Sequence, residues 1–105
     1  MVILTESNYH DVTNKGLVLL DFYAEWCHPC QIQLRNLNGL ERTIKEGRLT
    51  IAKVDIESES AIEERYQVEN IPTLILVKDG VELGRTVGCK TAKQIKKFMG
   101  DLLKR

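Results

Sequence analysis

The segment that most restricts the fold of this chain is the apolar run at residues 17–23, LVLLDFY, in which Asp21 is the only charged residue. A run of this length without polar alternation is typical of a strand that is covered on both faces. Such a strand requires packed elements on both sides of its sheet. The lone carboxyl group inside it also requires an explanation, because unpaired acids are rarely buried.

Segments with the patterns of strands and helices alternate along the rest of the chain. Apolar or alternating runs predict further strands at residues 2–4, 49–55, 73–77 and 81–87. Apolar periodicity and capping residues predict helices at residues 5–16, 30–46, 58–66 and 91–103. Lys78-Asp79-Gly80 predicts the turn of a hairpin between the last two strands. The order strand-helix-strand-helix-strand-helix-strand-strand-helix predicts one α/β domain over residues 1–105, with helices on both faces of the sheet.

Residues at the helix ends allow more specific predictions. Thr5 and Ser7 are candidate caps of the first helix, and Ser58 is a candidate cap of the third. Thr91 and Gln94 fit a capping box at the start of the last helix. Three apolar residues of the last strand alternate with other residues and are expected on one face: Val81, Leu83 and Val87.

Composition and charge exclude several classes of partner. Fifteen basic residues balance fifteen acidic ones among the 105 residues, without the basic footprint of a nucleic-acid-binding protein. No run approaches the roughly 20 apolar residues of a membrane span, and the apolar stretch at the N-terminus is too short for a signal-peptide core. We therefore expect a cytoplasmic monomer that binds neither nucleic acid nor membrane.

The motif Trp26-Cys27-His28-Pro29-Cys30 carries the chemistry of the chain. Two cysteines at this spacing at the start of a helix can close a small disulfide ring. Cys27 would lie in the first turn, where free N–H groups and the helix dipole favour a thiolate, and Pro29 suits that turn. Cys30, one turn further on, would be shielded. The motif predicts that Cys27 attacks a substrate disulfide and that Cys30 resolves the mixed disulfide.

Two other interpretations of the cysteines stay open at this point. Half of a zinc site would take Cys89 and either His28 or His10 as further ligands, although structural zinc usually needs two spaced ligand pairs. Inert core cysteines are the other interpretation, against which the flanking Trp, His and Pro indicate an exposed turn. Three cysteines cannot form a closed disulfide framework. We expect no bound metal.

The residues around the cysteines resemble those of the thioredoxin family. The stretch LLDFYAEWCHPC at residues 19–30 is similar to the family's active-site strand and helix start. Ile71-Pro72-Thr73-Leu74 is similar to its cis-proline loop, and Asp79-Gly80 followed by Val87-Gly88 is a third match. The resemblance implies the thioredoxin fold, with a central mixed five-stranded sheet flanked by four helices. It also implies a protein-disulfide reductase that serves as an electron carrier.

The resemblance also implies roles for individual residues. Asp21 would be a buried acid beneath the dithiol, with a pKa raised by burial, that helps to move the proton of Cys30. Lys53 matches the lysine that approaches this acid. Pro72 would be cis, and the backbone of Ile71 would pair with an extended stretch of substrate. The substrate-binding surface would comprise Trp26, His28, Pro29, Ile71, Pro72, Gly88 and Cys89.

Plainer explanations exist for several of these positions. Asp21 at a strand end and Lys53 on an ordinary outward strand position would both face water. Trp26 would fill the core, and an X–Pro bond is trans by default. Cys89 would be a small apolar loop residue rather than a regulatory or dimer-forming thiol.

Cofactors and partners follow from the resemblance as well. The only redox group expected on this chain is the disulfide, and NADPH and flavin are expected only on a partner thioredoxin reductase. Disulfide-containing proteins would be the substrates. Two alternatives stay open: a disulfide oxidase or isomerase tuned by His28, and a non-enzymatic interaction subunit with the same fold.

His28 stands where the family usually has glycine, and an imidazole beside the nucleophile can stabilise a thiolate. We predict that His28 makes the dithiol more oxidising, so that His28→Gly lowers the reduction potential. Equilibration of both proteins with a glutathione redox buffer measures this. Equal potentials within error would contradict the prediction.

Overall fold

The computed structural model describes all residues from 1 to 105. It contains five strands and four helices in the predicted order. The elements are β1 (Val2–Ile3), α1 (Tyr9–Thr13), β2 (Leu17–Tyr23), α2 (His28–Glu41), β3 (Thr50–Asp55), α3 (Ser60–Tyr66), β4 (Thr73–Lys78), β5 (Val81–Val87) and α4 (Ala92–Leu103).

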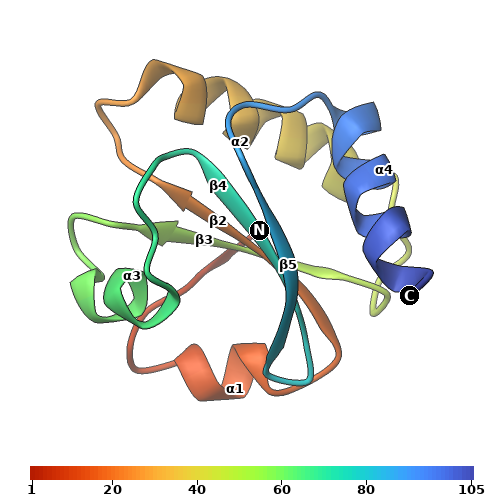
Figure 1. The fold of residues 1–105 in the computed structure, drawn as a ribbon, viewed down its shortest axis with the longest axis horizontal. Helices are drawn as coiled ribbons and strands as arrows, with labels where there is room; N and C mark the ends of the chain where they lie inside the picture. Colours follow the sequence, from red (N-terminus) through yellow and green to blue (C-terminus); the bar gives the residue numbers. More distant parts are fainter.

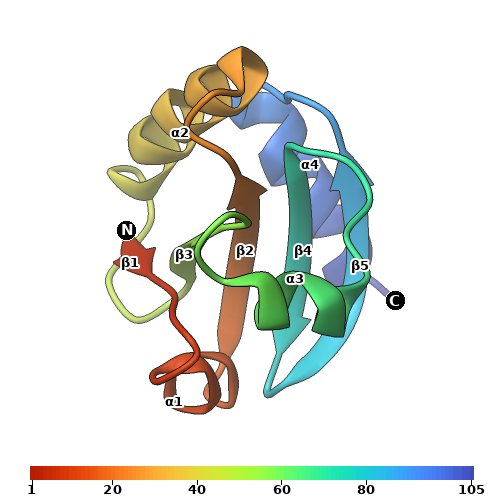
Figure 2. The same cartoon turned by 90° about the vertical axis from the view of Figure 1, so that its left-hand side faces the viewer.

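The strands form one mixed sheet in the order β1-β3-β2-β4-β5. Strands β1, β3 and β2 are parallel, whereas β4 and β5 run antiparallel to their neighbours. Helices α2 and α4 cover one face of the sheet, and α1 and α3 cover the other (Figures 1 and 2). The predicted α/β architecture, with helices on both faces of a mixed five-stranded sheet, is confirmed.

The central strand β2 is buried on both faces, as its unbroken apolar run predicts. Val18, Leu20 and Phe22 belong to the core on the side of α1 and α3. Leu19, one residue out of step, belongs to the core on the side of α2 and α4. Because side chains alternate along a strand, Asp21 faces the same side as Leu19, toward α2.

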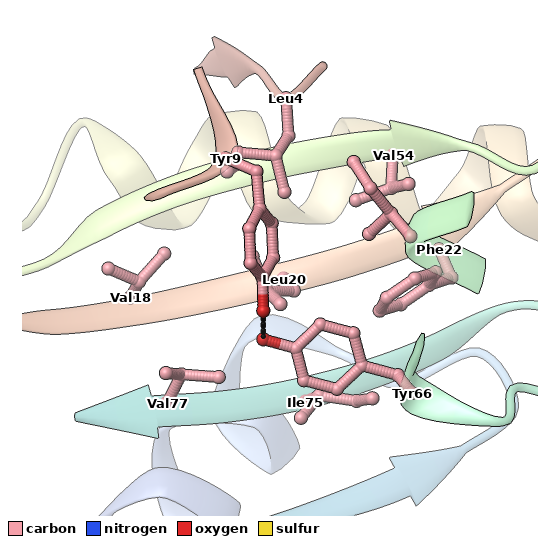
Figure 3. Packing of buried hydrophobic residues seen from close by; sticks show 11 residues of the cluster. Leu4, Tyr9, Val18, Leu20, Phe22, Val54, Tyr66, Ile75 and Val77 are labelled. Carbon is pink, nitrogen blue, oxygen red and sulfur yellow. Dashed lines mark hydrogen bonds between the residues drawn. The ribbon is translucent and has the colours of Figure 1, made fainter. Parts of the chain in front are cut away.

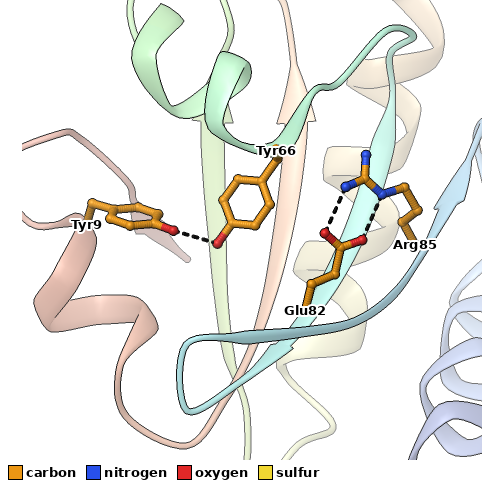
Figure 4. A network of polar contacts seen from close by, with 4 residues as sticks. All are labelled: Tyr9, Tyr66, Glu82 and Arg85. Atoms are coloured by element: carbon orange, nitrogen blue, oxygen red, sulfur yellow. Dashed lines mark hydrogen bonds and ion pairs between the residues drawn. The ribbon is translucent and has the colours of Figure 1, made fainter.

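A hydrogen bond between two tyrosines ties α1 to α3 across the first of these cores (Figure 3). The hydroxyl groups of Tyr9 and Tyr66 are 2.8 Å apart, so each polar group has a partner inside an apolar cluster. Next to them on β5, the carboxylate of Glu82 binds the guanidinium of Arg85 through two hydrogen bonds of 2.8 Å (Figure 4). Each of these four polar side chains therefore has a hydrogen-bond partner within the protein, and a structural role is enough to explain its presence.

The predicted caps of the first and third helices are wrong. Asn8 and Glu59 occupy these N-cap positions, and neither makes a capping hydrogen bond with its side chain. The hydroxyl groups of Thr5 and Ser7 bond to each other at 2.9 Å, and that of Ser58 donates to the carbonyl oxygen of Asp55 at the end of β3. Hydrogen bonds within the loops have replaced capping.

The capping box at the start of α4 is confirmed. The Thr91 hydroxyl accepts a hydrogen bond from the backbone N–H of Gln94, whose side chain accepts one from the backbone N–H of Thr91.

Helix α2, the longest helix of the chain, ends at Glu41, earlier than predicted. The Thr43 hydroxyl donates to the Leu40 carbonyl at 2.7 Å, and a tight turn follows Glu41 in place of further helix.

The predicted alternation in the last strand is wrong. The pairing of β5 with β4 shifts by one residue at Leu83, so the bulge changes which side chains share a face. Val81 and Val87 are exposed by 63% and 51%. Gly84 follows the bulge, and a Cβ atom there would lie 2.7 Å from the Leu102 side chain of α4. A glycine therefore permits the close approach of β5 and α4.

Candidate redox site at the start of helix α2

The two cysteines of the motif lie at the N-terminus of α2 and are joined by a disulfide bond. Cys27 is the N-cap residue and Cys30 lies in the first turn, with their Cα atoms 5.2 Å apart. Cys27 retains 6% of its surface exposed, whereas Cys30 is completely buried. The pair therefore presents one accessible and one shielded sulfur atom.

Position at the N-cap gives Cys27 a favourable electrostatic environment. Its Sγ atom accepts a hydrogen bond from the backbone N–H of Cys30 at 3.3 Å. Pro29 stands within the first two helical positions, and no acidic residue lies in the first turn. Free N–H groups and the positive end of the helix dipole stabilise a thiolate at such a position.

Asp21 is completely buried, and neither of its carboxyl oxygens has a hydrogen-bond partner. Burial raises the pKa of this carboxyl group from 3.8 to about 7, while the Gln33 amide and the Lys53 ammonium group act against the rise. The interpretation of Asp21 as a water-facing residue is wrong. A group with this pKa can accept or release a proton near neutral pH.

Lys53 lies opposite Asp21 on the neighbouring strand β3, so the pairing register brings the two residues together. The lysine is only partly buried, and its Nζ atom stands 5.6 Å from the centre of the Tyr23 ring. No ion pair joins Lys53 to Asp21. Lys53 therefore acts on the carboxyl group through its charge and not through a direct contact.

Gln33 is a site residue that the sequence analysis missed. It is completely buried on the face of α2 that also carries Cys30, Leu37 and Leu40. Its Oε1 atom accepts a hydrogen bond from the backbone N–H of Lys90 at 2.7 Å. The available signal was the helical spacing of residues 30, 33, 37 and 40, which places a polar side chain among buried positions.

The loop before β4 also reaches the cysteines. The peptide bond between Ile71 and Pro72 is cis, as the resemblance implies. Ile71 packs against the buried cluster that contains both cysteines. The carbonyl oxygen of Pro72 accepts a hydrogen bond from the backbone N–H of Gly88 at 2.8 Å. Residues 71, 72 and 88 are thereby brought to one side of the dithiol.

The remaining predicted site residues lie at the surface. Trp26 is 71% exposed, so its interpretation as core filling is wrong, and its indole N–H donates to the carboxylate of Glu57. His28 and Pro29 are exposed at the start of α2. Cys89, next to Gly88, is an exposed free cysteine.

The dithiol lies on an open surface. None of the five surface cavities is lined by Cys27 or Cys30, and the largest, of about 630 Å³, lies beside α3. Small-molecule sites are usually concave and enclosing. A flat surface with an exposed tryptophan suits the docking of another protein better.

The structure contains no group of three or more His, Cys, Asp or Glu side chains placed to hold a metal ion. None of its helices has both the length and the apolar character needed to cross a membrane.

Comparison with known proteins agrees with this geometry. The thioredoxin family profile matches residues 1–101. A thioredoxin of Chlamydia trachomatis serovar D is 42% identical over 97 residues, which cover 92% of this chain and 93% of that protein. The chloroplastic thioredoxin Y1 of Arabidopsis thaliana is 41% identical over 87 residues, covering 83% of this chain and 50% of that protein. The solved structure of Fasciola hepatica thioredoxin is 30% identical, with a TM-score of 0.86, and the match covers 96% of this chain and 98% of that one.

A disulfide-forming cysteine pair at a helix N-terminus, on a mixed sheet of this topology, defines a thiol–disulfide oxidoreductase. The chain belongs to the thioredoxin family, whose members carry no cofactor beyond the redox-active disulfide.

Burial of Asp21 predicts a pH-dependent stability that an uncharged replacement removes. Because folding raises the pKa of this carboxyl group from 3.8 to about 7, the native state binds the proton more tightly than the unfolded state. Through this group, the free energy of unfolding should therefore fall by about 4 kcal/mol as the pH rises from about 4 to about 7. Above pH 7 it should stay level.

Urea unfolding of the disulfide form at pH 4 and pH 8 measures this effect in wild type, Asp21→Asn and Asp11→Asn. The loss should be absent in Asp21→Asn and retained in Asp11→Asn, where an exposed acid of α1 is replaced. The same loss in Asp21→Asn as in wild type would show that Asp21 is not its source.

Proposed function

We propose that the chain reduces disulfide bonds of other proteins, with Cys27 as the attacking thiol and Cys30 as the resolving thiol. The observation that carries this assignment is the difference in burial between two sulfur atoms at one helix N-terminus. The accessible sulfur can meet a substrate, and the buried one can meet only its partner.

The reaction transfers two electrons from the dithiol to the substrate. The Cys27 thiolate attacks one sulfur atom of the substrate disulfide, whose S–S bond breaks, and the second substrate sulfur leaves as a thiolate that takes a proton from water. The Cys30 thiol then loses its proton and attacks the Cys27 sulfur. The mixed disulfide breaks, the first substrate sulfur leaves as a thiolate that takes a proton from water, and the Cys27–Cys30 disulfide remains.

We assign the acceptance of the Cys30 proton to Asp21. The carboxyl group faces α2 from the central strand, and its raised pKa keeps a large fraction able to take up or release a proton near pH 7. Lys53 would assist by favouring the charged form of Asp21 from the neighbouring strand. Neither residue would bond to the substrate.

Substrate docking is assigned to the surface formed by Trp26, His28, Pro29, Ile71, Pro72, Gly88 and Cys89. Support comes from the exposure of Trp26 and from the packing of Ile71 against the cysteine cluster. An extended substrate segment beside Ile71 could pair with its backbone, as an added strand does at a sheet edge.

Each cycle leaves a disulfide that needs an external source of electrons. We propose that a thioredoxin reductase, which itself carries flavin and draws on NADPH, reduces this disulfide. We also propose that the chain acts as a monomer and as one domain, in the cytoplasm. These assignments rest on the family and on the chemistry of the disulfide product.

Substitution of each cysteine separates the assigned roles. With dithiothreitol as electron source, wild type should accelerate the reduction of insulin disulfides, and Cys27→Ser should lose the acceleration completely. Cys30→Ser should accumulate a mixed disulfide with insulin at Cys27, located by mass spectrometry of peptides. Retained acceleration by Cys27→Ser would overturn the assignment, and a Cys27→Ser protein that still supports its cellular role would indicate an interaction subunit.

A further inference from the structure

Two side chains of α2 bind both backbone polar groups of Lys90, in the loop between β5 and α4. The Oε1 atom of Gln33 accepts from the Lys90 N–H at 2.7 Å, and the Nδ2 atom of Asn36 donates to the Lys90 carbonyl at 2.8 Å. Residues three apart lie on the same side of a helix, so the two amides act as a pair. The loop that follows Gly88 is thereby fastened to the helix that carries the cysteines.

The bond to Lys90 also fixes the orientation of the Gln33 amide. A backbone N–H is a donor, so the atom that meets it must be the amide oxygen and not the amide nitrogen. The NH₂ group is consequently directed away from Lys90. It is buried there without a hydrogen-bond partner.

The atoms left without a partner in the protein interior are complementary to one another. Three buried side-chain polar atoms lack a hydrogen bond: Oδ1 and Oδ2 of Asp21, and Nε2 of Gln33. The first two are acceptors on the face of β2 that looks toward α2, and the third is a donor on the buried face of α2. The amide of Gln33 also acts to lower the pKa of Asp21, as a donor to the charged form does.

We infer that Gln33 is a positioning residue for the buried acid, with its amide NH₂ group held by the Lys90 contact so that it donates to the charged carboxylate of Asp21. This inference deepens the proposed function and rests on the assignment of Asp21 as the acceptor of the Cys30 proton. A donor that favours the carboxylate keeps Asp21 ready to take up that proton. The Gln33 side chain would thus connect Asp21 with the loop at residues 88–90, which is far from Asp21 in the sequence.

Other groups around Asp21 do not replace this donor. From β3, Lys53 offers a charge but forms no ion pair with Asp21, and from β4 the paired residue is the apolar Leu74. Tyr23 is the phenol on the same side of β2. From α2, Cys30 stands on the same buried face as Gln33. Among the residues that surround Asp21, Gln33 is therefore the neutral hydrogen-bond donor whose side chain is completely buried.

The test compares the pKa of Asp21 in wild type, Gln33→Met and Asn36→Ala. Carbon-13 NMR of the carboxyl group measures this pKa in the disulfide form of each protein. Gln33→Met keeps the volume and the unbranched shape while it removes the donor, and should raise the pKa by about 1, a tenfold change in the protonation equilibrium. Asn36→Ala loosens the same loop without touching the acid, and should leave the pKa unchanged.

An unchanged pKa in folded Gln33→Met would overturn the inference. An equal rise in Asn36→Ala would also overturn it, because the loop and not the amide would then be responsible. Thermal unfolding verifies that each variant is folded, and Gln33→Leu replaces Gln33→Met if the latter is not.

The pH profile of insulin-disulfide reduction separates this inference from the proposed function. If Asp21 accepts the Cys30 proton, the inflection of the wild-type profile should move upward in Gln33→Met and vanish in Asp21→Asn. Should Asp21→Asn keep the wild-type inflection, the proton-acceptor assignment would fail. The carboxyl titration would still decide whether Gln33 donates to Asp21.

Discussion

Desolvation of Asp21 is the constraint on which the other features of the site depend. The carboxyl group sits in the central strand of the sheet, which has neighbours on both edges and helices over both faces, so water is excluded from every direction. That exclusion raises the pKa of the group to about 7. The packing that stabilises the fold is therefore also the source of a proton-transfer group that works near neutral pH.

The same burial carries a cost in stability. Above pH 7 the carboxyl group is charged in a buried site where no ion pair offsets the loss of hydration. An apolar residue in place of Asp21 would remove this penalty, so the acid makes sense only as part of the chemistry. Helix α2 connects these parts of the site: its N-terminal end carries both cysteines, and its buried face turns Gln33 toward the interior.

Much of this arrangement could be predicted from local patterns. The bounds of β2 follow directly from its apolar run, and the burial of Asp21 follows from its place in that run. The bulge at Leu83 could not be predicted, because it depends on how β5 meets β4 and α4 in space. The N-cap at Asn8 was missed because hydrogen bonds inside the preceding loop compete with capping. Gln33 was missed because a polar side chain interrupts the apolar pattern of the helix, although residues 30, 33, 37 and 40 share one buried face of α2.

The most direct test of this account is a titration of the Asp21 carboxyl carbon by NMR in the wild-type disulfide form. We predict a pKa of about 7, well above the ordinary value of 3.8 for this carboxyl group. A value near 3.8 would contradict it, because the carboxyl group would then be hydrated or paired and could not serve as the proton acceptor beneath the dithiol.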